Sequence, residues 1–485
     1  MDYEQYRTSL IKGYYTHQLE TLMSNFDPSR NTVILLPGGM GSQLERTEHP
    51  YPANPNVIND VIWLDWGIRR PKYDAYKMEI DDTGQDKDSF VIAAHGPVKF
   101  FTQTPYVELE DRARARRWNY GVFGFDWRRP LKESSSYFKT FILDFRQRVL
   151  DDFGRKYDPI PNLTIVCHSM GGLVCTNALR DTTFSGLGFN AIMTIGTPFY
   201  GTSTHQDRYF IGEPLLNNLK YGAKNVVRIV ASLPGPFTLM FLPKAVYDRD
   251  HAKIGLSRYP QFDPNGNISD PFDRAIMRRW PKTVRDHWQY IDASRNEMFD
   301  IAAPINANIA AKFCNVRSAV DSTTAVELIW KDVDGETIDP EVGPSPLTGL
   351  AGPGDGTVPA WSAFHAYCKN RHDLKRARHH GTLLEHDEVL TLIEKVVTTG
   401  KLSGRGKGGA KGPTVASSQK VNRAVTKWAA RREQTPPPPE LFEEPVQRAF
   451  LASLMGGTKP RIVGKSPHTA SPQRKAASNR KSGKK

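Results

Sequence analysis

Residues 163–173 read Leu163-Thr-Ile-Val-Cys167-His168-Ser169-Met170-Gly171-Gly172-Leu173. An apolar run typical of a buried strand leads into a turn of small residues, and the segment after the turn has the character of a helix. A serine at such a sharp turn takes strained backbone dihedrals, so its neighbours two positions away must be small. Gly171 meets this requirement, while Cys167 stands where the usual pattern has a glycine. The pattern predicts that Ser169 is a nucleophile, and the alternative is a turn that merely joins a strand to a helix.

A serine hydroxyl is a weak nucleophile and needs an adjacent base, which a carboxylate must orient. When the serine sits on a strand-to-helix turn of this kind, the chain order is serine, acid and then histidine. The Gly- and Pro-rich loop 352–359 presents Asp355, and it follows the apolar stretch Phe313–Val320, which we expect to be a late strand. We therefore predict Asp355 as the acid. The alternative is an Asx turn, in which the carboxylate only caps its own backbone.

The base has to be chosen among five histidines that follow Asp355, namely His365, His372, His379, His380 and His386. Leu374–Arg378 fits the end of the last strand, and the apolar positions of Leu383–Val397 recur at the spacing of an amphipathic helix. A catalytic histidine belongs on the loop between these two elements. We predict His380, which Gly381 follows, ahead of its neighbour His379 and then His386.

Acyl transfer also needs N–H donors aimed at the oxyanion that develops on the substrate. The early apolar stretch Thr32–Leu36 runs into the Gly-rich loop 37–41, which can bring a backbone N–H close to the substrate. We assign one donor to the N–H of Met40 in this loop and the other to the N–H of Met170, directly after the serine. Phosphate binding is the alternative role for such a loop, but no Gly-Lys-Ser/Thr follows it, so it is not a Walker loop.

A second conspicuous carboxylate follows the apolar stretch Gly121–Phe125, where Asp126, Trp127 and Arg128 stand in sequence. These three residues are candidates for a wall of the substrate site. The alternative is that Asp126 and Arg128 form a structural ion pair. Neither reading makes Asp126 catalytic.

Six motifs in chain order resemble those of the lecithin:cholesterol acyltransferase family, which has an α/β-hydrolase fold. The motifs cover roughly residues 31–398 and are Pro37–Glu45, Val61–Asp65, Asp126–Arg128, His168–Gly172, Gly196–Gly201 and Gly354–Pro359. The resemblance implies a Ser/Asp/His acyl-enzyme mechanism on a lipid ester, with the acyl chain passed to an alcohol or to water. Family members also resemble lipases and phospholipases, so the acceptor stays open.

The periodicity of the chain predicts an α/β protein with a mostly parallel, doubly wound sheet. The apolar runs expected as buried parallel strands are Thr32–Leu36, Phe90–Ala94, Gly121–Phe125, Leu163–Val166 and Ala191–Ile195, with helices such as Tyr137–Phe153 between them. Residues 1–30 form an N-terminal extension, and residues 31–202 and 306–398 form the α/β-hydrolase core. Residues 203–305, with the apolar patch Phe237–Leu242, are an inserted lid or cap, or else an ordinary helical excursion packed on the core.

Residues 399–485 form a basic, low-complexity tail that is expected to be disordered. From Lys401 onward there are 19 Lys and Arg against 4 Glu, a net charge of +15, whereas the whole chain of 485 residues carries +13. Val421, Val425 and Trp428 recur at helical spacing among basic residues. The tail is therefore expected to contact an anionic membrane or an acidic partner, with nucleic acid as the less favoured ligand and a merely solubilising role as the alternative.

Four scattered cysteines exclude a disulfide framework, and neither a signal peptide nor an apolar run near 18 residues is visible. We expect a cytoplasmic, peripheral protein that needs no cofactor and no metal. Three functions fit the sequence. They are a serine acyltransferase or lipase of lipid esters, an esterase of small soluble esters, and a non-catalytic hydrolase-fold scaffold with a nucleic-acid-binding tail.

Overall fold

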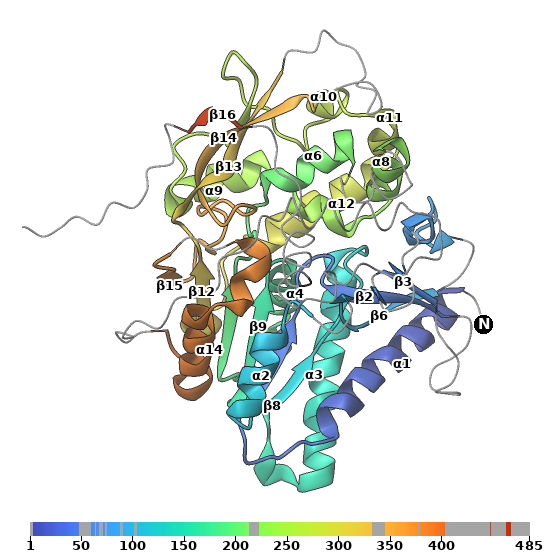
Figure 1. The fold of residues 1–485 in the computed structure, drawn as a ribbon, viewed down its shortest axis with the longest axis vertical. Coiled ribbons are helices and arrows are strands. Elements are labelled where there is room, and N and C mark those ends of the chain that lie inside the picture. The colour runs from blue at the N-terminus through green and yellow to red at the C-terminus, as the bar shows by residue number, and fades with distance from the viewer. Residues whose placement is uncertain are drawn as a thin grey trace, which may run out of the picture.

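A computed structural model of the chain is shown in Figure 1. It describes residues 3–47, 60–63, 65–66, 71–72, 75–87, 91–100, 104–212, 223–331, 345–376, 379–402, 447 and 462–466.

The centre of the fold is a six-stranded sheet in which every neighbouring pair is parallel. Its strand order is β15-β12-β10-β9-β1-β8, and the bounds are β1 Thr32–Leu36, β8 Asn119–Val122, β9 Leu163–His168, β10 Ala191–Ile195, β12 Phe313–Arg317 and β15 Asn370–Asp373. β1, β9 and β10 are buried at every position, as expected of parallel strands covered on both faces. The predicted mostly parallel sheet is thus confirmed.

Helices cover both faces of this sheet (Figure 1). Successive side chains of β1 point to opposite faces and show which helices cover each one. Val33 and Leu35 point into one apolar cluster, which also holds residues of α2 (Val107–Ala115) and α14 (Asp387–Thr399). Ile34 and Leu36 point into the other cluster, together with α1 (Tyr3–Met23), α3 (Leu131–Phe153) and α4 (Met170–Ala178). Because both faces are covered, the carboxyl edge of the strands is the place left for a site.

The first ninety residues differ from the sequence-based expectation in two ways. Residues 1–30 are no separate extension, since α1 packs on β8, β6 and α3 and buries Leu10, Tyr14 and Leu22. The described part of the run Phe90–Ala94, residues 91–94, does not join the central sheet either, and Phe90 lies outside the described residues. Residues 91–94 lie in β6 (Val91–Pro97), which pairs antiparallel with β2 (Ser42–Thr47) in a small sheet that also holds β3 (Asp60–Trp63). A short apolar run indicates a buried strand but not its partner, which explains the error.

Several element boundaries also move. β8 ends at Val122, so the predicted strand Gly121–Phe125 is longer than the observed one. The last strand of the central sheet, β15, ends at Asp373 rather than within Leu374–Arg378, and residues 377 and 378 lie outside the described residues. The remaining short elements outside residues 203–305 are β4 Asp65–Trp66, β5 Pro71–Lys72, η1 Ala75–Met78, β7 Lys99–Phe100, η3 Arg155–Tyr157, η4 Ile160–Asn162, α5 Thr182–Ser185, α13 Ala307–Lys312 and η7 His380–Glu385.

Residues 203–212 and 223–305 are mainly helical and lie above the carboxyl edge of the sheet (Figure 1). They form α6 Ser203–Ile211, α8 Ala223–Ala231, η6 Gly235–Leu239, α9 Lys244–Ile254, β11 Gln261–Phe262, α10 Arg274–Met277, α11 Lys282–Arg285 and α12 Trp288–Ile301. The patch Phe237–Leu242 is buried apart from a half-buried Leu239. Backbone hydrogen bonds also tie it to the core, from Thr202 to Leu239 (2.8 Å) and from Leu242 to Tyr200 (3.1 Å). In this structure the patch is packed on the core rather than presented as an apolar surface.

A second sheet connects this region to the end of the chain. Its order is β11-β13-β14-β16, with β13 Asp321–Trp330, β14 Leu347–Gly354 and β16 Ile462–Lys465. β16 pairs parallel with β14, and the N–H of Ser466 donates to the carbonyl of Ala351 at 2.8 Å. This part of the tail therefore adds a strand to the fold through backbone pairing, while the side chains of Ile462 and Val463 remain exposed. Residues 403–446, which include Trp428, and residues 448–461 and 467–485 of the tail lie outside the described residues.

All four cysteines are free and buried. Within the ranges that the structure describes, no helix combines the length and the apolar character needed to cross a bilayer.

Candidate active site

Ser169 sits at the junction between β9 and α4 with φ 51° and ψ −124°, a left-handed conformation that is costly for any residue with a side chain. Its N–H donates to the carbonyl of Ile195 at 3.0 Å, which fixes the turn to the neighbouring strand. A Cβ atom at Gly171 would collide with the carbonyls of Leu36 and Pro37, so this position requires glycine. The turn is held in its strained form by packing and lifts the serine above the carboxyl edge of the sheet.

Ser169, His380 and Asp355 form one chain of hydrogen bonds. His380 Nε2 lies 2.8 Å from Ser169 Oγ, and His380 Nδ1 lies 2.7 Å from Asp355 Oδ2. A carboxylate can only accept, so Nδ1 carries the proton and Nε2 is left to accept from the serine hydroxyl. Asp355 and His380 are each 1% exposed, so the hydrogen bond between them is shielded from water, whereas the bond from His380 to the half-buried Ser169 is partly buried.

The two oxygens of Asp355 have different tasks. Oδ1 accepts from the backbone N–H groups of Thr357 (3.0 Å) and Val358 (2.6 Å), while Oδ2 faces His380. The Asx turn considered as the alternative role is thus present together with the contact to histidine. Thr324 Oγ1, on β13, accepts from the N–H of Gly356 at 2.8 Å and supports the same loop.

Among the five histidines after Asp355, His380 is the one that contacts both the serine and the acid. His379 is exposed, His372 lies in β15, and His386 directly precedes α14. His365 is fully buried and its Nε2 donates to the carbonyl of Ile301 at 3.0 Å. Burial lowers the pKa of His365 to about 4, so this histidine is neutral and serves the packing of the core.

The loop that holds Met40 lies against the serine turn. A Cβ atom on Gly39 would stand 3.2 Å from Sδ of Met170, so the two segments are neighbours. Met40 has φ 63°, and Nε1 of the buried Trp63 donates to its carbonyl at 3.0 Å. Met170 is the first residue of α4, so its N–H has no acceptor within the helix. Within the described residues, neither of these N–H groups has an acceptor, which leaves both free for an anion.

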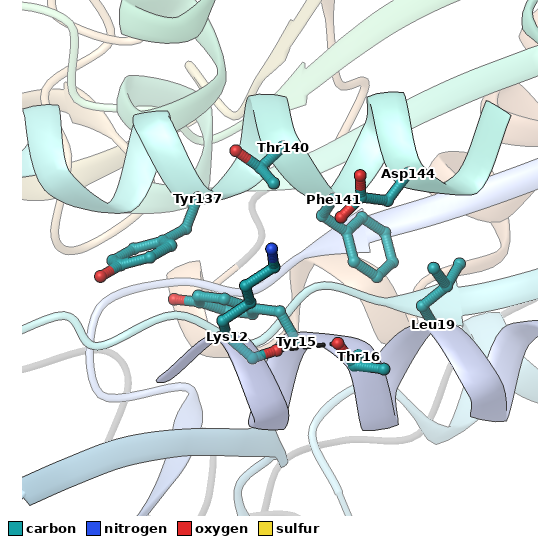
Figure 2. A pocket seen from close by; sticks show the side chains of 8 residues that line it. All are labelled: Lys12, Tyr15, Thr16, Leu19, Tyr137, Thr140, Phe141 and Asp144. Carbon is teal, nitrogen blue, oxygen red and sulfur yellow. Dashed lines mark hydrogen bonds between the residues drawn. The ribbon is translucent and has the colours of Figure 1, made fainter. Parts of the chain in front are cut away.

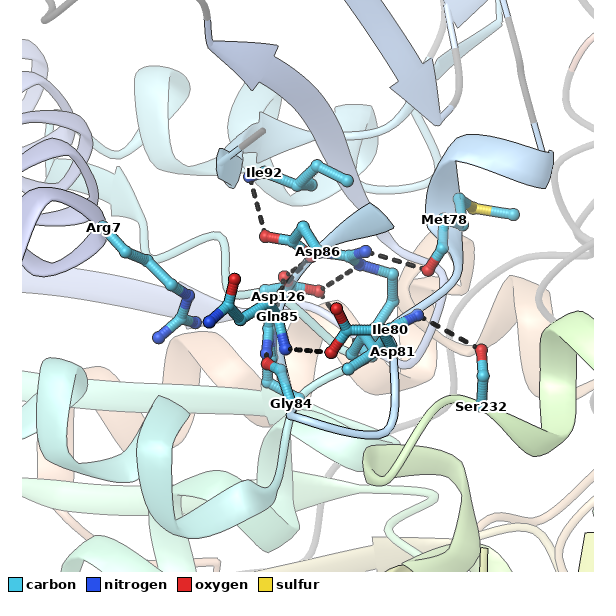
Figure 3. Close-up of polar contacts among 12 residues, drawn as sticks. Arg7, Met78, Ile80, Asp81, Gly84, Gln85, Asp86, Ile92, Asp126 and Ser232 are labelled. Carbon is cyan, nitrogen blue, oxygen red and sulfur yellow. Dashed lines mark hydrogen bonds and ion pairs between the residues drawn. The ribbon is translucent and has the colours of Figure 1, made fainter. Parts of the chain in front are cut away.

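Asp126 and Arg128 belong to a buried ion network. Figure 3 shows Asp126 and Asp86 of this network. Arg128 pairs with Asp126 at 2.6 Å and with Asp86 at 2.9 Å, and it donates to the carbonyl of Met78 at 2.9 Å. Arg129 pairs with Asp86 at 2.7 Å. Burial alone would raise the pKa of Asp86, but the charges of Arg128 and Arg129 hold it below its usual range. These charged side chains are paired with one another. The arrangement therefore favours a structural ion pair of Asp126 and Arg128 over a role in the wall of the substrate site.

Trp127 differs from its two neighbours. Its ring packs edge-on against Trp63, with centroids 5.5 Å apart, and Trp63 holds the carbonyl of Met40. Trp127 therefore belongs to the aromatic support of the Met40 loop.

Sequence reasoning missed how tightly Gly196 fits beneath the site. A Cβ atom there would stand 3.1 Å from Asp355 Oδ2 and 3.2 Å from His380 Nδ1, and Gly196 has φ 61°. Its place directly after β10 was a usable signal, because a glycine at the carboxyl end of a parallel strand often allows a close approach.

A groove lies elsewhere on the molecule, between α1 and α3 (Figure 2). Its lining comes from these two helices alone and includes neither Ser169, Asp355 nor His380; the residues are Lys12, Tyr15, Thr16, Leu19, Tyr137, Thr140, Phe141 and Asp144.

No family model and no curated protein matches the sequence. Among solved structures, the chain is similar to one in the Tle4–Tli4 complex, with a TM-score of 0.51 and 16% identity over 77% of this chain and 99% of that one. It is also similar to the mature form of lipase BlEst2 from Bacillus licheniformis, with a TM-score of 0.34 and 11% identity over 76% and 93% of the two chains. The parallel sheet and the likeness to the chain in the Tle4–Tli4 complex establish an α/β-hydrolase fold.

Proposed function

We propose that this chain is a serine-dependent hydrolase or O-acyltransferase of lipid carboxylic esters that forms an acyl-enzyme on Ser169. The observation that carries the proposal is the hydrogen-bonded chain from Asp355 through His380 to Ser169. Its order along the sequence, its burial and the strained turn under the serine are the features that acyl transfer by serine requires.

In the first half of the proposed reaction, Ser169 Oγ attacks the ester carbonyl carbon while His380 Nε2 takes the hydroxyl proton. Asp355 Oδ2 stabilises the imidazolium that results and keeps its ring in place. The carbonyl oxygen gains the negative charge, and the N–H groups of Met40 and Met170 donate to it. When the carbon–oxygen bond to the leaving alcohol breaks, His380 returns the proton to that alcohol, and the acyl group stays on Ser169.

In the second half, the oxygen of a water molecule or an acceptor alcohol attacks the acyl carbon while His380 takes its proton. The bond between that carbon and Ser169 Oγ then breaks, His380 returns the proton to Oγ, and the free acid or the new ester leaves. Hydrolase and transferase differ only in this acceptor. No metal enters any step.

One observation supports a lipid ester as the substrate. It is the resemblance of six sequence motifs to those of the lecithin:cholesterol acyltransferase family, which is the finer assignment that we propose within the α/β-hydrolase fold.

A fluorophosphonate probe tests the proposed nucleophile. We expect wild-type protein to be labelled and Ser169→Ala to remain unlabelled while keeping its thermal stability. Turnover of p-nitrophenyl esters from acetate to palmitate then tests the substrate class, and we expect kcat/KM to rise with acyl length. Labelling of Ser169→Ala equal to wild type would exclude the proposed nucleophile.

An esterase of small soluble esters is the second candidate, and the burial of Phe237–Leu242 favours it, since the structure shows no apolar lid surface in this segment. A kcat/KM that peaks at acetate or butyrate, with no increase when the substrate forms micelles, would select this candidate.

We also propose that the basic tail contacts an anionic membrane. Each basic residue near such a surface contributes about 1 kcal/mol, so several together would hold the protein there. Binding of the full chain to phosphatidylserine vesicles, with a steep salt dependence, is expected. Stronger binding to duplex DNA than to vesicles at equal salt would favour nucleic acid instead.

A further inference from the structure

His168 precedes the serine and touches the proposed base in two ways. Its Nε2 lies 3.1 Å from the backbone carbonyl oxygen of His380, and its ring packs against the His380 ring with centroids 5.0 Å apart and planes tilted by 32°. His168 is 1% exposed, and none of the steps proposed above uses it.

The protons along this contact can be assigned. A carbonyl oxygen only accepts, so His168 Nε2 carries a proton and donates it, and Nδ1 is then an acceptor in the neutral ring. The hydroxyl of Tyr106 lies 3.4 Å from Nδ1 and accepts a hydrogen bond from the N–H of Gly38 at 2.9 Å. These hydrogen bonds all donate in one direction, from the Gly38 N–H through Tyr106 and His168 to the His380 carbonyl. Each hydrogen bond therefore polarises the next.

Both side chains stay neutral throughout the working range of the enzyme. Burial, with a smaller effect from His380, lowers the pKa of His168 to about 3, and burial raises the pKa of the Tyr106 hydroxyl above its usual range. Neither group can exchange a proton during turnover at neutral pH, so their contribution is geometric.

We propose that Tyr106 and His168 are positioning residues that connect the loop carrying the Met40 N–H donor to the backbone of the proposed base, His380. This inference rests on the proposed function. Tyr106 fixes Gly38 at the start of that loop, and His168 fixes the carbonyl of His380 and one face of its ring. A displacement of about 1 Å in a reacting group can lower the rate about 100-fold, so such supports matter for kcat even though they do not touch substrate.

Three variants test the inference with a short soluble ester. His168→Leu keeps the apolar bulk but loses both hydrogen bonds, and kcat should fall about 100-fold with KM nearly unchanged. His168→Gln retains a donor for the His380 carbonyl and an acceptor for Tyr106, so kcat should recover to within about 3-fold of wild type. Tyr106→Phe should lower kcat about 10-fold.

Tyr120→Phe is the matched control. Tyr120 lies on β8, near Tyr106. In the part of the chain that the structure describes, the Tyr120 hydroxyl has no hydrogen-bond partner. The kcat of Tyr120→Phe should equal that of the wild-type protein. Equal kcat in His168→Leu and wild type would overturn the inference, as would failure of His168→Gln to rescue activity while remaining folded.

The connection between the two residues is tested by the double variant. If Tyr106 acts through His168, Tyr106→Phe should cost less than about 3-fold in a His168→Leu background, against about 10-fold in wild type. The same 10-fold loss in both backgrounds would contradict a connected pair.

A readout independent of turnover separates this inference from the proposed function. The proton between His380 Nδ1 and Asp355 Oδ2 should give a far-downfield NMR resonance, which we expect to shift and broaden in Tyr106→Phe and in His168→Leu but not in Tyr120→Phe. An unchanged resonance in both test variants would refute positioning, even in an active enzyme. Shifted resonances in a protein without ester turnover would leave positioning standing and reject the proposed function.

Discussion

Asp355 and His380 are joined twice, once between their side chains (Oδ2 to Nδ1, 2.7 Å) and once between their backbones, where the N–H of His380 donates to the carbonyl of Asp355 at 2.9 Å. The loop after β14 and the start of η7 are therefore held together independently of the side-chain contact. A substitution at position 355 can then alter the chemistry while leaving the position of His380 largely in place.

Asp355→Asn is expected to lower kcat about 10,000-fold without unfolding the protein. The reason lies in Oδ1, which accepts from the N–H groups of Thr357 and Val358. The amide oxygen of asparagine must take that place, so its NH₂ group faces His380 and forces Nδ1 to accept. The proton then sits on Nε2, which can no longer accept from Ser169. Steady-state kinetics and thermal unfolding check both halves of this expectation.

His380→Ala should abolish most ester turnover, whereas His379→Ala, its exposed neighbour, should keep it. Ser169→Ala combined with His380→Ala should be no slower than either single variant, because the two residues act as a unit. A dead His379→Ala beside an active His380→Ala would move the base by one residue. Multiplicative losses in the double variant would show that the pair does not act together.

Gly196→Ala should destabilise the protein and remove activity, since the added methyl group would collide with Leu383 Cδ1 at 2.6 Å and press on Asp355 and His380. Gly188→Ala is the control, because Gly188 also has a left-handed φ, 86°, but nothing lies within 4 Å of the new atom. Both variants carry a conformational cost of about 1 kcal/mol. Only Gly196→Ala should also lower kcat, by about 100-fold. Equal kcat in the two variants would indicate that the site tolerates the displacement.

Acid should destabilise the fold through its buried histidines. The pKa of His365 is lowered to about 4 and that of His168 to about 3, so the unfolded chain binds more protons than the folded one between those values and about 6.5. Each histidine therefore removes about 2 kcal/mol of stability when the pH falls from 7 to 5. Asp207, whose pKa burial raises to about 6, acts in the opposite direction, and so do Asp270 and Glu297, whose pKa values burial also raises. The buried His205, whose pKa burial lowers well below its usual range, acts in the same direction as His365 and His168.

Urea unfolding at pH 5 and pH 7 measures this effect. His365→Gln should make stability less dependent on pH, while His379→Gln, an exposed control, should leave the dependence unchanged. A chain whose free energy of unfolding is greater at pH 5 than at pH 7 would contradict the assignment of neutral buried histidines.

Two truncations separate the structural part of the tail from the rest. A chain that ends at Ser466 keeps β16 and should match the full chain in soluble-ester turnover and thermal stability. A chain that ends at Arg461 loses the strand that pairs with β14, just before Asp355, and its stability should fall by about 1–3 kcal/mol with a lower kcat. Identical unfolding temperatures for the two chains would show that β16 adds nothing to the fold.

The sequence predicted best where local pattern determines structure. The turn around Ser169 needs small neighbours, and the loops around Asp355 and His380 follow recognisable strands, so these residues could be proposed without coordinates. Contacts between segments that are distant in the sequence could not be recognised from local sequence patterns. Nothing near Tyr106 indicates that its hydroxyl meets Gly38 and His168, and the apolar run Val91–Ala94 looks the same whether it joins the parallel sheet or pairs with β2. The pairing of Ile462 with β14 likewise depends on an edge formed more than a hundred residues earlier.

That pairing also has a consequence for synthesis on the ribosome. β14 is complete at Gly354, yet its partner β16 begins only at Ile462. At about 5–20 residues per second, the nascent chain carries this unpaired edge for roughly 5–20 s. An open strand edge is a template for pairing with another chain. Premature termination anywhere between these two strands would therefore leave the edge permanently open, and such fragments should aggregate where the complete chain does not.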